Sequence, residues 1–251
     1  MRKLKLPKFF KYNQCEDLTR IGGKYDGGYL ISETDIEKSD VLLSFGIDVD
    51  WKFERDFFRI KEIPIYSYDA STNFPLFIKR AIGALLRYDF KKFFFFLVGF
   101  FKFKKFFTGK KNFIPKFVGL ENNKYHLSLN EVISETDFLN YFLKMDIEGS
   151  EYRCLDDLIK HQDKISGIVI EFHDIDLHLN KIEEFISKFN LKIVHIHINN
   201  WTLVGKNDLP LLIEVTFSKH GKTNNDFANY PHTLDSPNST KLPNFVVSFN
   251  E

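Results

Sequence analysis

The segment Phe138-Leu-Asn-Tyr-Phe-Leu-Lys-Met-Asp-Ile-Glu-Gly-Ser-Glu151 decides the fold class. Its apolar half predicts a buried strand, and the glycine and carboxylates that follow predict a turn into a helix. This strand would deliver Asp146 and Glu148 to the carboxyl edge of a parallel sheet, where open α/β folds bind their ligands. The alternative interpretation is that both carboxylates only stabilise the start of the next helix, whose dipole favours negative charge there.

Strand-like apolar runs recur along the rest of the chain, and helical patterns lie between several of them. Residues 151–161 and 181–189 carry apolar side chains at helical spacing. The nearly continuous apolar character of several runs is typical of strands that are covered on both faces. We therefore predict an α/β fold with a doubly wound, mostly parallel sheet in a single domain, 1–251. The six further predicted strands span residues 41–46, 63–68, 116–120, 167–173, 191–197 and 211–217.

The charge balance and the cysteine content disfavour several classes of protein. Lys and Arg number 35 against 34 Asp and Glu, so no global field attracts nucleic acid, and we expect no nucleic-acid partner. The two cysteines, Cys15 and Cys154, show neither metal-ligand spacing nor a disulfide framework. The basic N-terminus lacks the apolar segment of a secretory signal. A cytoplasmic location fits these features.

The connection over residues 71–115 is too long for an ordinary crossover and is predicted to be an insertion. Its residues 90–107 contain ten phenylalanines and five lysines. A transmembrane helix is disfavoured, because roughly 20 apolar residues are needed and Lys102, Lys104 and Lys105 interrupt the run. The alternatives are a helical hairpin packed on the domain or on a second subunit, a lid over the substrate, and a peripheral membrane contact.

Two strand ends form a pattern suited to an adenosyl ligand. Gly46 ends the strand at 41–46, and a glycine there lets the backbone approach a ligand closely. Asp69 ends the next strand, where a carboxylate can accept two hydrogen bonds from a ribose diol. The first loop holds only one glycine, so the dinucleotide fingerprint G-x-G-x-x-G is absent and pyrophosphate binding has little support.

Five pieces of the chain together resemble the FkbM-type, S-adenosylmethionine-dependent methyltransferases, and the last of them fits the branch of methyltransferase-like proteins. They cover roughly residues 20–217, and the Asp-Ile-Glu-Gly-Ser-Glu segment is the most specific. The pieces are Asp26-Gly-Gly-Tyr29, Ser44-Phe-Gly-Ile47 with Phe53-Glu54, Tyr68-Asp69, Lys144-Met-Asp-Ile-Glu-Gly-Ser-Glu151 and His195-Ile-His-Ile-Asn-Asn200.

The resemblance implies a Rossmann-like class I methyltransferase fold with a seven-stranded, mostly parallel sheet and an antiparallel last strand. It also implies S-adenosyl-L-methionine as the cofactor, with Gly46 facing the methionine part and Asp69 the ribose. Leu120 and Glu121 would lie near the adenine. The residues expected to bind the cofactor are Ser44, Phe45, Gly46, Asp48, Asp69, Ala70, Leu120 and Asp146.

Polar side chains at the same sheet edge are the candidates for catalysis. Methyl transfer to a hydroxyl requires a positioned acceptor and removal of its proton by a carboxylate, a histidine or a metal-lowered pKa. Strand alternation places Glu171 and His173 on one face. Asp146, Asp174 and Asn200 are the candidate oxygen ligands of a Mg²⁺ ion. The residues with a predicted catalytic role are Asp146, His173, His197 and Glu171.

The leading hypothesis is an S-adenosylmethionine-dependent O-methyltransferase that acts on a small molecule or a sugar hydroxyl. The resemblance alone suggests that the sugar belongs to a surface glycan or its precursor. One alternative is a methyltransferase of a macromolecule, protein or nucleic acid. Another is a non-catalytic binding module on a methyltransferase fold, which the intact carboxylates at the sheet edge disfavour. A homo-oligomer and a membrane-peripheral location through residues 90–107 are left open.

Overall fold

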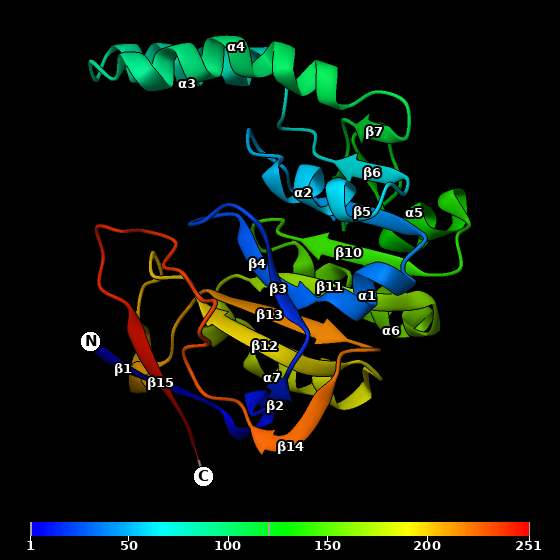
Figure 1. Cartoon of the computed structure of the whole chain (residues 1–251), viewed down its shortest axis with the longest axis vertical. Helices are drawn as coiled ribbons and strands as arrows, with labels where there is room; N and C mark the ends of the chain where they lie inside the picture. The colour runs from blue at the N-terminus through cyan, green and yellow to red at the C-terminus, as the bar shows by residue number, and fades with distance from the viewer. Residues whose placement is uncertain (1, 120, 251) are drawn as a thin grey trace.

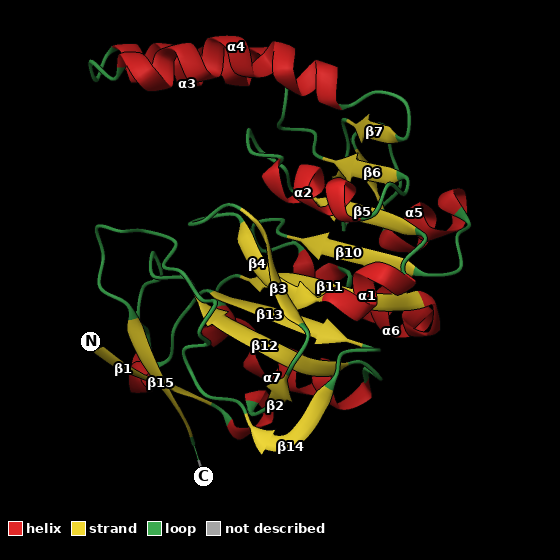
Figure 2. Ribbon diagram, viewed as in Figure 1, coloured by secondary structure: helices red, strands yellow, loops and turns green. Residues whose placement is uncertain are grey.

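A seven-stranded sheet forms the centre of the molecule, with helices on both of its faces (Figures 1 and 2). The structure is a computed structural model that describes residues 2–119 and 121–250. In spatial order the strands are β12 (Lys192–Ile198), β13 (Ile213–Ser218), β11 (Ile165–Phe172), β10 (Tyr141–Met145), β5 (Val41–Phe45), β6 (Ile65–Tyr68) and β7 (Lys111–Ile114). β13 runs antiparallel to both of its neighbours. The predicted doubly wound, Rossmann-like α/β fold with an antiparallel last strand is confirmed.

The centre of the sheet is closed to water. Every residue of β5, β10 and β11 is buried, which explains their continuous apolar runs. β5 pairs in parallel with β6 on one side and with β10 on the other. The carboxyl ends of these three strands therefore meet at one edge, and Gly46, Asp69 and Asp146 directly follow them.

The third sheet strand was predicted at the wrong place. It is β7, whereas the predicted stretch 116–120 contains β8 (Phe117–Val118), which pairs with β9 (His126–Leu127) in a separate two-stranded sheet. β7 is an edge strand of half-buried residues, so Lys-Asn-Phe-Ile lacks the apolar density of a covered strand. Because β7 belongs to the central sheet, the inserted part of the chain lies before it.

Helices and a hairpin cover the two faces of the sheet. One face carries α1 (Glu33–Lys38), α2 (Lys52–Ile60) and a hairpin of β3 (Leu18–Gly22) with β4 (Gly28–Ser32), and these elements share one hydrophobic core. The other face carries α5 (Leu129–Thr136), α6 (Leu155–His161) and α7 (Ile175–Lys188). The helical patterns predicted within 151–161 and 181–189 correspond to α6 and α7.

The two ends of the chain meet in small sheets beside the main one. Two pairs of strands form there: β1 (Arg2–Leu6) runs parallel to β15 (Phe245–Phe249), and β2 (Asn13–Cys15) antiparallel to β14 (Thr223–Phe227). The C-terminal segment thus crosses the domain and covers the β12 side. Short 3₁₀ helices complete the structure, at η1 (Lys8–Phe10), η2 (Glu151–Arg153), η3 (Gln162–Lys164) and η4 (Lys206–Asp208).

The predicted Phe/Lys-rich helical insertion is a hairpin of two helices, α3 (Phe74–Leu85) and α4 (Phe90–Phe106), which projects beyond the domain (Figure 1). Gly99 of α4 allows close packing, because a Cβ there would lie 3.1 Å from the ring of Phe77. Phe77, Phe103 and Val49 anchor the hairpin in a small core of its own. Among the described residues, no helix is long and apolar enough to cross a membrane.

Candidate functional site

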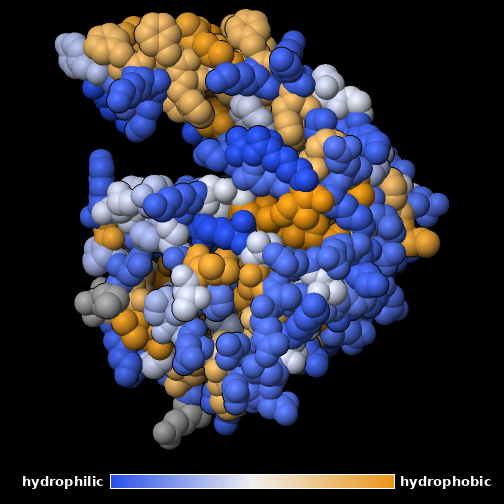
Figure 3. Space-filling model, viewed as in Figure 1, coloured by the Kyte–Doolittle hydropathy of each residue, from blue (hydrophilic) through white to orange (hydrophobic). Residues whose placement is uncertain are grey.

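A cavity of about 610 Å³ opens at the carboxyl ends of β5, β6 and β10. Its walls are the loops after these strands, the turn of the β3–β4 hairpin, β8 and the base of α3. Figure 3 shows the molecule hollowed beneath the α3–α4 hairpin. The cavity lies at the sheet edge where the sequence predicts a ligand, and its size suits a small molecule or cofactor.

Carboxylates outnumber cationic side chains around this cavity. Among the described lining residues, Arg80 and Lys144 are the lysine and arginine side chains, against six acids. A lining of this kind favours a ligand with positive charge and disfavours a polyanion. The acids are Asp26, Asp48, Asp50, Asp69, Asp146 and Glu148.

Gly46 forms the floor of the cavity and cannot carry a side chain. Its φ is +76°, in the left-handed region, and a Cβ would lie 1.6 Å from the carbonyl oxygen of Asp146. The Gly46 N–H donates to the carbonyl of Tyr68 at 3.1 Å, and Lys144 Nζ donates to the Gly46 carbonyl. The ends of β5, β6 and β10 can converge here only because this residue is glycine.

Asp69 holds two loops of the cavity wall together. Its carboxylate accepts from the N–H groups of Ile47 and Asp48, and from the N–H and hydroxyl groups of both Ser71 and Thr72, at 2.6 to 3.3 Å. Burial opposes ionisation, but these hydrogen bonds lower the pKa of Asp69 below its usual value. Six donors exceed the roughly four lone-pair sites of a carboxylate. A ribose diol would therefore have to exchange with the Ser71 and Thr72 hydroxyls.

The other predicted cofactor-binding residues divide into two groups. Asp48 lines the cavity in a left-handed conformation, with φ of 51°, and its carboxylate pairs with Arg80 of α3 at 2.7 Å. Ser44 is buried and donates to Glu54, and Phe45 lies in the core, so neither reaches the cavity. Of the residues that the structure describes, Ala70 is likewise outside the lining. Leu120 lies outside the described residues.

One wall of the cavity, formed by β8 and β9, was not predicted from the sequence. Phe117 and Val118 of β8 and His126 of β9 line the cavity, and the rings of Phe117 and His126 lie 5.5 Å apart. Apolar and aromatic side chains of this kind suit the face of a purine. The signal in the sequence was the apolar stretch at 116–120, which we interpreted as a strand of the main sheet.

His173 and three carboxylates form a cluster at the cavity edge. His173 follows β11, and its Nδ1 lies 3.1 Å from Oε1 of Glu151, a residue with 0% exposure. Its Nε2 lies 3.4 Å from Glu148 and 3.9 Å from Asp146, both of which line the cavity. The Glu151 carboxylate also accepts from the Ile147 N–H at 2.9 Å, which fixes its position. The predicted pair Asp146 and His173 is thus brought together.

The charges in this cluster favour a protonated imidazole. Burial alone would lower the pKa of His173, but the hydrogen bond and charge of Glu151, with the charges of Asp146 and Glu148, outweigh it and raise the pKa. Burial and the nearby acids raise the pKa of Glu148, and His173 opposes this effect. His173 is therefore a titratable group that can take a proton from an acceptor, with Glu151 orienting its ring.

The predicted Mg²⁺ ligands do not assemble. Asp174 is exposed at the start of α7, and the Asn200 amide donates to the carbonyls of Ser239 and Leu242 in the C-terminal segment. Position at a strand end does not fix the partners of a side chain, and the Asn200 amide is engaged by the C-terminal segment. A different set, Asp146 with Glu148 and His173, places one donor atom from each residue within 4.8 Å of the others.

A row of buried titratable side chains crosses three strands next to the cavity. Glu171 of β11 stands opposite Glu214 of β13, and Glu214 stands opposite His197 of β12. Glu171 accepts from the Asn199 amide at 3.0 Å and from the Tyr29 hydroxyl at 3.3 Å. Tyr29 of β4 also lies 3.4 Å from Asp146, so it connects the row to the cavity.

His197, a predicted catalytic residue, is buried in this row. Its Nε2 lies 2.9 Å from Oδ1 of Asn238, whose amide donates to Glu214 at 2.8 Å. Asp235 lies 3.1 Å from His195 Nε2 and 3.3 Å from His197 Nδ1, without hydrogen-bond geometry. Burial disfavours the charged form of His197, but Glu214 and Asp235 raise its pKa. Sequence reasoning missed Tyr29, Glu214, Asp235 and Asn238 as members of this network.

Replacing Glu171 with glutamine is expected to stabilise the protein at alkaline pH. Burial, followed by the charges of Asp146 and Glu214, raises the pKa of Glu171 well above its usual value. The folded chain then keeps this proton where the unfolded chain releases it, so stability is lost as the pH rises above about 4.3. Glutamine resembles the protonated form and cannot ionise. We expect a melting temperature about 4 °C above that of the wild type at pH 8.

Scanning calorimetry between pH 4 and pH 9 tests this expectation. The difference in melting temperature between Glu171→Gln and the wild type should vanish near pH 4, where glutamate and glutamine at this position are both neutral. Glu183→Gln, an exposed position on α7, is the matched control and should show no such trend. A Glu171→Gln variant that is less stable than the wild type at pH 8 would show that the ionised carboxylate is needed by the fold.

Comparisons with known proteins give similarities at the level of solved structures. No family model matches the chain, and no curated protein matches it. A precorrin-6y C5,15-methyltransferase from Geobacter metallireducens shares 10% identity over 74% of this chain and 84% of that chain, with a TM-score of 0.35. An rRNA methylase from Streptococcus thermophilus shares 7% identity over 74% and 92%, with a TM-score of 0.36. TYW2 of M. jannaschii, in complex with AdoMet, shares 10% over 82% and 88%, with a TM-score of 0.33.

Identities and TM-scores this low carry no information about the substrate of this chain. A function for this chain must therefore be argued from the geometry of its own cavity.

Proposed function

We propose that this protein is an S-adenosylmethionine-dependent O-methyltransferase that acts on a hydroxyl of a small molecule or sugar, as in a surface glycan or its precursor. The observation that carries the proposal is the acidic cavity at the carboxyl edge of the sheet, with the His173–Glu151 pair beside it. The preference for a glycan rests on the sequence resemblance to FkbM-type methyltransferases.

The cavity offers a place for each part of the cofactor. Asp69 and the Gly46 turn suit the ribose and the methionine part, and the wall of Phe117, Val118 and His126 suits the adenine. The excess of lining carboxylates matches a sulfonium and an ammonium group, both of which are cations. The residues present therefore fit S-adenosylmethionine.

The chain's own residues would then remove the proton of the acceptor. When bound, the cofactor supplies an electrophilic methyl group. His173 Nε2 faces Asp146 and Glu148 at the cavity wall, where it can accept the hydroxyl proton as the acceptor oxygen attacks. Glu151, buried against Nδ1, stabilises the resulting imidazolium and holds the ring in place. Positioning of the acceptor supplies the remaining part of the catalysis.

A divalent cation is a second candidate occupant of this cluster. The observation in its favour is the set Asp146, Glu148 and His173, whose donor atoms lie within 4.8 Å of one another. One imidazole and two carboxylates suit Mn²⁺ better than the predicted Mg²⁺. Calorimetric titration of the wild type and Asp146→Asn with Mn²⁺ tests this alternative: saturable binding that Asp146→Asn abolishes would favour a metal-assisted reaction over the His173 base.

The wild type is expected to bind one S-adenosylhomocysteine with micromolar affinity, and Asp69→Asn to weaken that binding about 10- to 100-fold. The asparagine keeps the shape of the side chain but loses the charge that its many donors and the ribose require. Isothermal titration calorimetry measures both affinities. Asp50→Asn is the matched control. Asp50 lines the same cavity, but its carboxylate accepts a hydrogen bond from the N–H of Lys52, the first residue of α2.

Two contrary results have different meanings. A folded wild type that does not bind S-adenosylhomocysteine would overturn the proposed function. Equal affinities of the wild type and Asp69→Asn would leave the cofactor in place but remove Asp69 from the ribose.

A further inference from the structure

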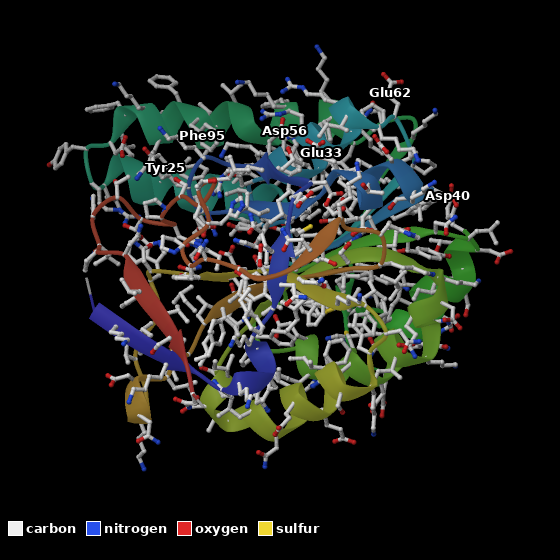
Figure 4. All side chains as sticks on the ribbon, turned by 60° about the horizontal axis from the view of Figure 1, so that its bottom comes forward. Tyr25, Glu33, Asp40, Asp56, Glu62 and Phe95 are labelled. Carbon is white, nitrogen blue, oxygen red and sulfur yellow. The ribbon has the colours of Figure 1, made fainter. Side chains whose placement is uncertain are left out.

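The outer side of the α3–α4 hairpin exposes a large apolar surface that no described residue covers. In α4, Phe94 and Phe101 are 60% and 66% exposed, and in the turn Leu86 and Tyr88 are 76% and 83% exposed. Figure 3 shows hydrophobic side chains gathered along the hairpin at the top of the molecule, and Figure 4 shows Phe95 among them. Scattered apolar residues are normal on a surface, but a contiguous set of this size indicates an interaction.

α4 has two apolar faces on opposite sides of the helix. The inner face packs on α3 and the domain through Gly99 and Phe103. The outer face repeats exposed apolar residues at intervals of four, three and four, which places them on one stripe. The inner face is the one that packs on the domain, whereas the residues of the outer stripe are exposed. The outer stripe consists of Phe90, Phe94, Leu97 and Phe101.

The hairpin also has a large net positive charge, unlike the rest of the molecule. Residues 74–107 contain eight lysines and arginines and one acid, Asp89, which gives a formal charge of +7. The whole chain carries +1, so everything outside the hairpin carries −6. Lys91, Lys102 and Lys105 flank the outer stripe of α4, at helix positions beside it.

We propose that the outer face of the α3–α4 hairpin docks on the surface of an anionic lipid membrane. The phenylalanine stripe would enter the boundary between head groups and acyl chains, and the flanking lysines would reach the lipid phosphates. The opposite charges of the hairpin and the remaining domain would orient the molecule, with the hairpin toward the negative surface. This proposal is independent of the chemistry proposed for the cavity.

The distribution of charge favours a membrane over a second copy of this chain. Two hairpins of +7 each would repel one another in a symmetric dimer. Single-stranded RNA binds grooves that combine lysines with stacking aromatic rings. The exposed apolar residues lie instead on a projecting hairpin (Figure 1) and include aliphatic members, among them Ile82, Leu85 and Val98, which do not stack on bases.

The hairpin is connected to the cavity at its base. Leu76 and Arg80 of α3 line the cavity, and Arg80 pairs with Asp48 at 2.7 Å. A molecule docked through the hairpin would thus hold the cavity close to the lipid head groups.

Vesicle flotation of the full chain tests the proposal. We expect binding to vesicles of phosphatidylcholine with phosphatidylglycerol, and none to phosphatidylcholine alone. The double variant Phe94→Ser with Phe101→Ser should weaken binding at least about tenfold, since two apolar anchors are lost. Its matched control, Leu139→Ser with Leu177→Ser, changes two residues that are each 75% exposed on the body of the domain, and should bind like the wild type.

The electrostatic part has a separate test. Lys102→Glu with Lys105→Glu should weaken binding to the anionic vesicles about 25-fold or more, as should raised salt. Lys181→Glu with Lys192→Glu makes the same charge change at exposed positions on α7 and β12, and should have a much smaller effect.

Several results would overturn the proposal. A folded wild type that does not float with anionic vesicles contradicts it, as does equal binding by Phe94→Ser with Phe101→Ser. A solution dimer that this variant dissociates, without vesicle binding, would assign the surface to a second copy. Retention of single-stranded RNA in place of vesicles would assign it to nucleic acid.

Discussion

Replacing Gly46 with alanine is expected to lower the free energy of unfolding by at least about 3 kcal/mol. The Cβ would lie 1.6 Å from the carbonyl oxygen of Asp146, and the backbone has φ of +76°. The clash is with the backbone of Asp146 at the end of β10, so no side-chain rotation relieves it. Urea unfolding followed by circular dichroism gives the loss, and the same variant should fail to bind S-adenosylhomocysteine because the cavity floor is displaced.

Gly109→Ala is the matched control for this prediction. Gly109 also has a positive φ, of +64°, but nothing lies within 4 Å of its Cβ position. Its alanine variant therefore measures the conformational cost alone, about 1 kcal/mol. A loss in Gly46→Ala no greater than that in Gly109→Ala would show that β5 and β10 do not converge as closely as the structure has them.

The central strands could be predicted because burial on both faces leaves a continuous apolar run. Val41–Phe45 and Ile165–Phe172 are buried throughout, and both were recognised in the sequence. The edge strand Lys111–Ile114 could not be found in the same way. It is half buried, and only its pairing with β6 makes it a sheet strand. We predicted the third sheet strand in the more apolar stretch that follows it, residues 116–120.

The site could be predicted where it depends on strand ends. Gly46, Asp69 and Asp146 follow three adjacent parallel strands, so the order of the sheet brings them around one cavity. Glu151 was interpreted as part of a helix start, but its carboxylate turns back to His173, which lies 22 residues later. A side chain's direction at a helix start cannot be derived from spacing alone.

The buried row could not be predicted, because it depends on register between strands. Glu214 lies on the antiparallel strand, and only its pairing places it between Glu171 and His197. Tyr29 reaches the row from the β3–β4 hairpin, a local feature that the sequence showed only as a glycine-rich loop.

Replacing His173 with glutamine is expected to lower the rate of methyl transfer about 10²- to 10⁴-fold, with no change in the affinity for S-adenosylhomocysteine. Glutamine can still hydrogen-bond to Glu151 but cannot take the acceptor proton. The rate is measured as transfer of labelled methyl from S-adenosylmethionine to a polysaccharide extract that the wild type methylates. His161→Gln is the control, because the His161 ring bonds to Asn130, whereas the His173 ring faces the cavity-lining carboxylates of Asp146 and Glu148. An unchanged rate in His173→Gln would exclude His173 as the base.

The pH dependence of this rate separates a base from a structural histidine. A general base must be deprotonated, so the rate should rise with pH through the pKa of His173, which Glu151, Asp146 and Glu148 hold above its usual value despite burial.

Glu151→Gln removes the hydrogen-bonded charge, so the rising limb should move to lower pH and the maximal rate should fall, because the imidazole becomes a weaker base. Glu148→Gln should move the limb less, since the Glu148 side chain is 87% exposed and its charge is screened by solvent. If the rising limb of the pH–rate profile keeps its position in Glu151→Gln, the group that controls the rate is a residue other than His173. If the limb moves, and an NMR titration of the His173 ring shows the same shift in pKa, the controlling group is this imidazole.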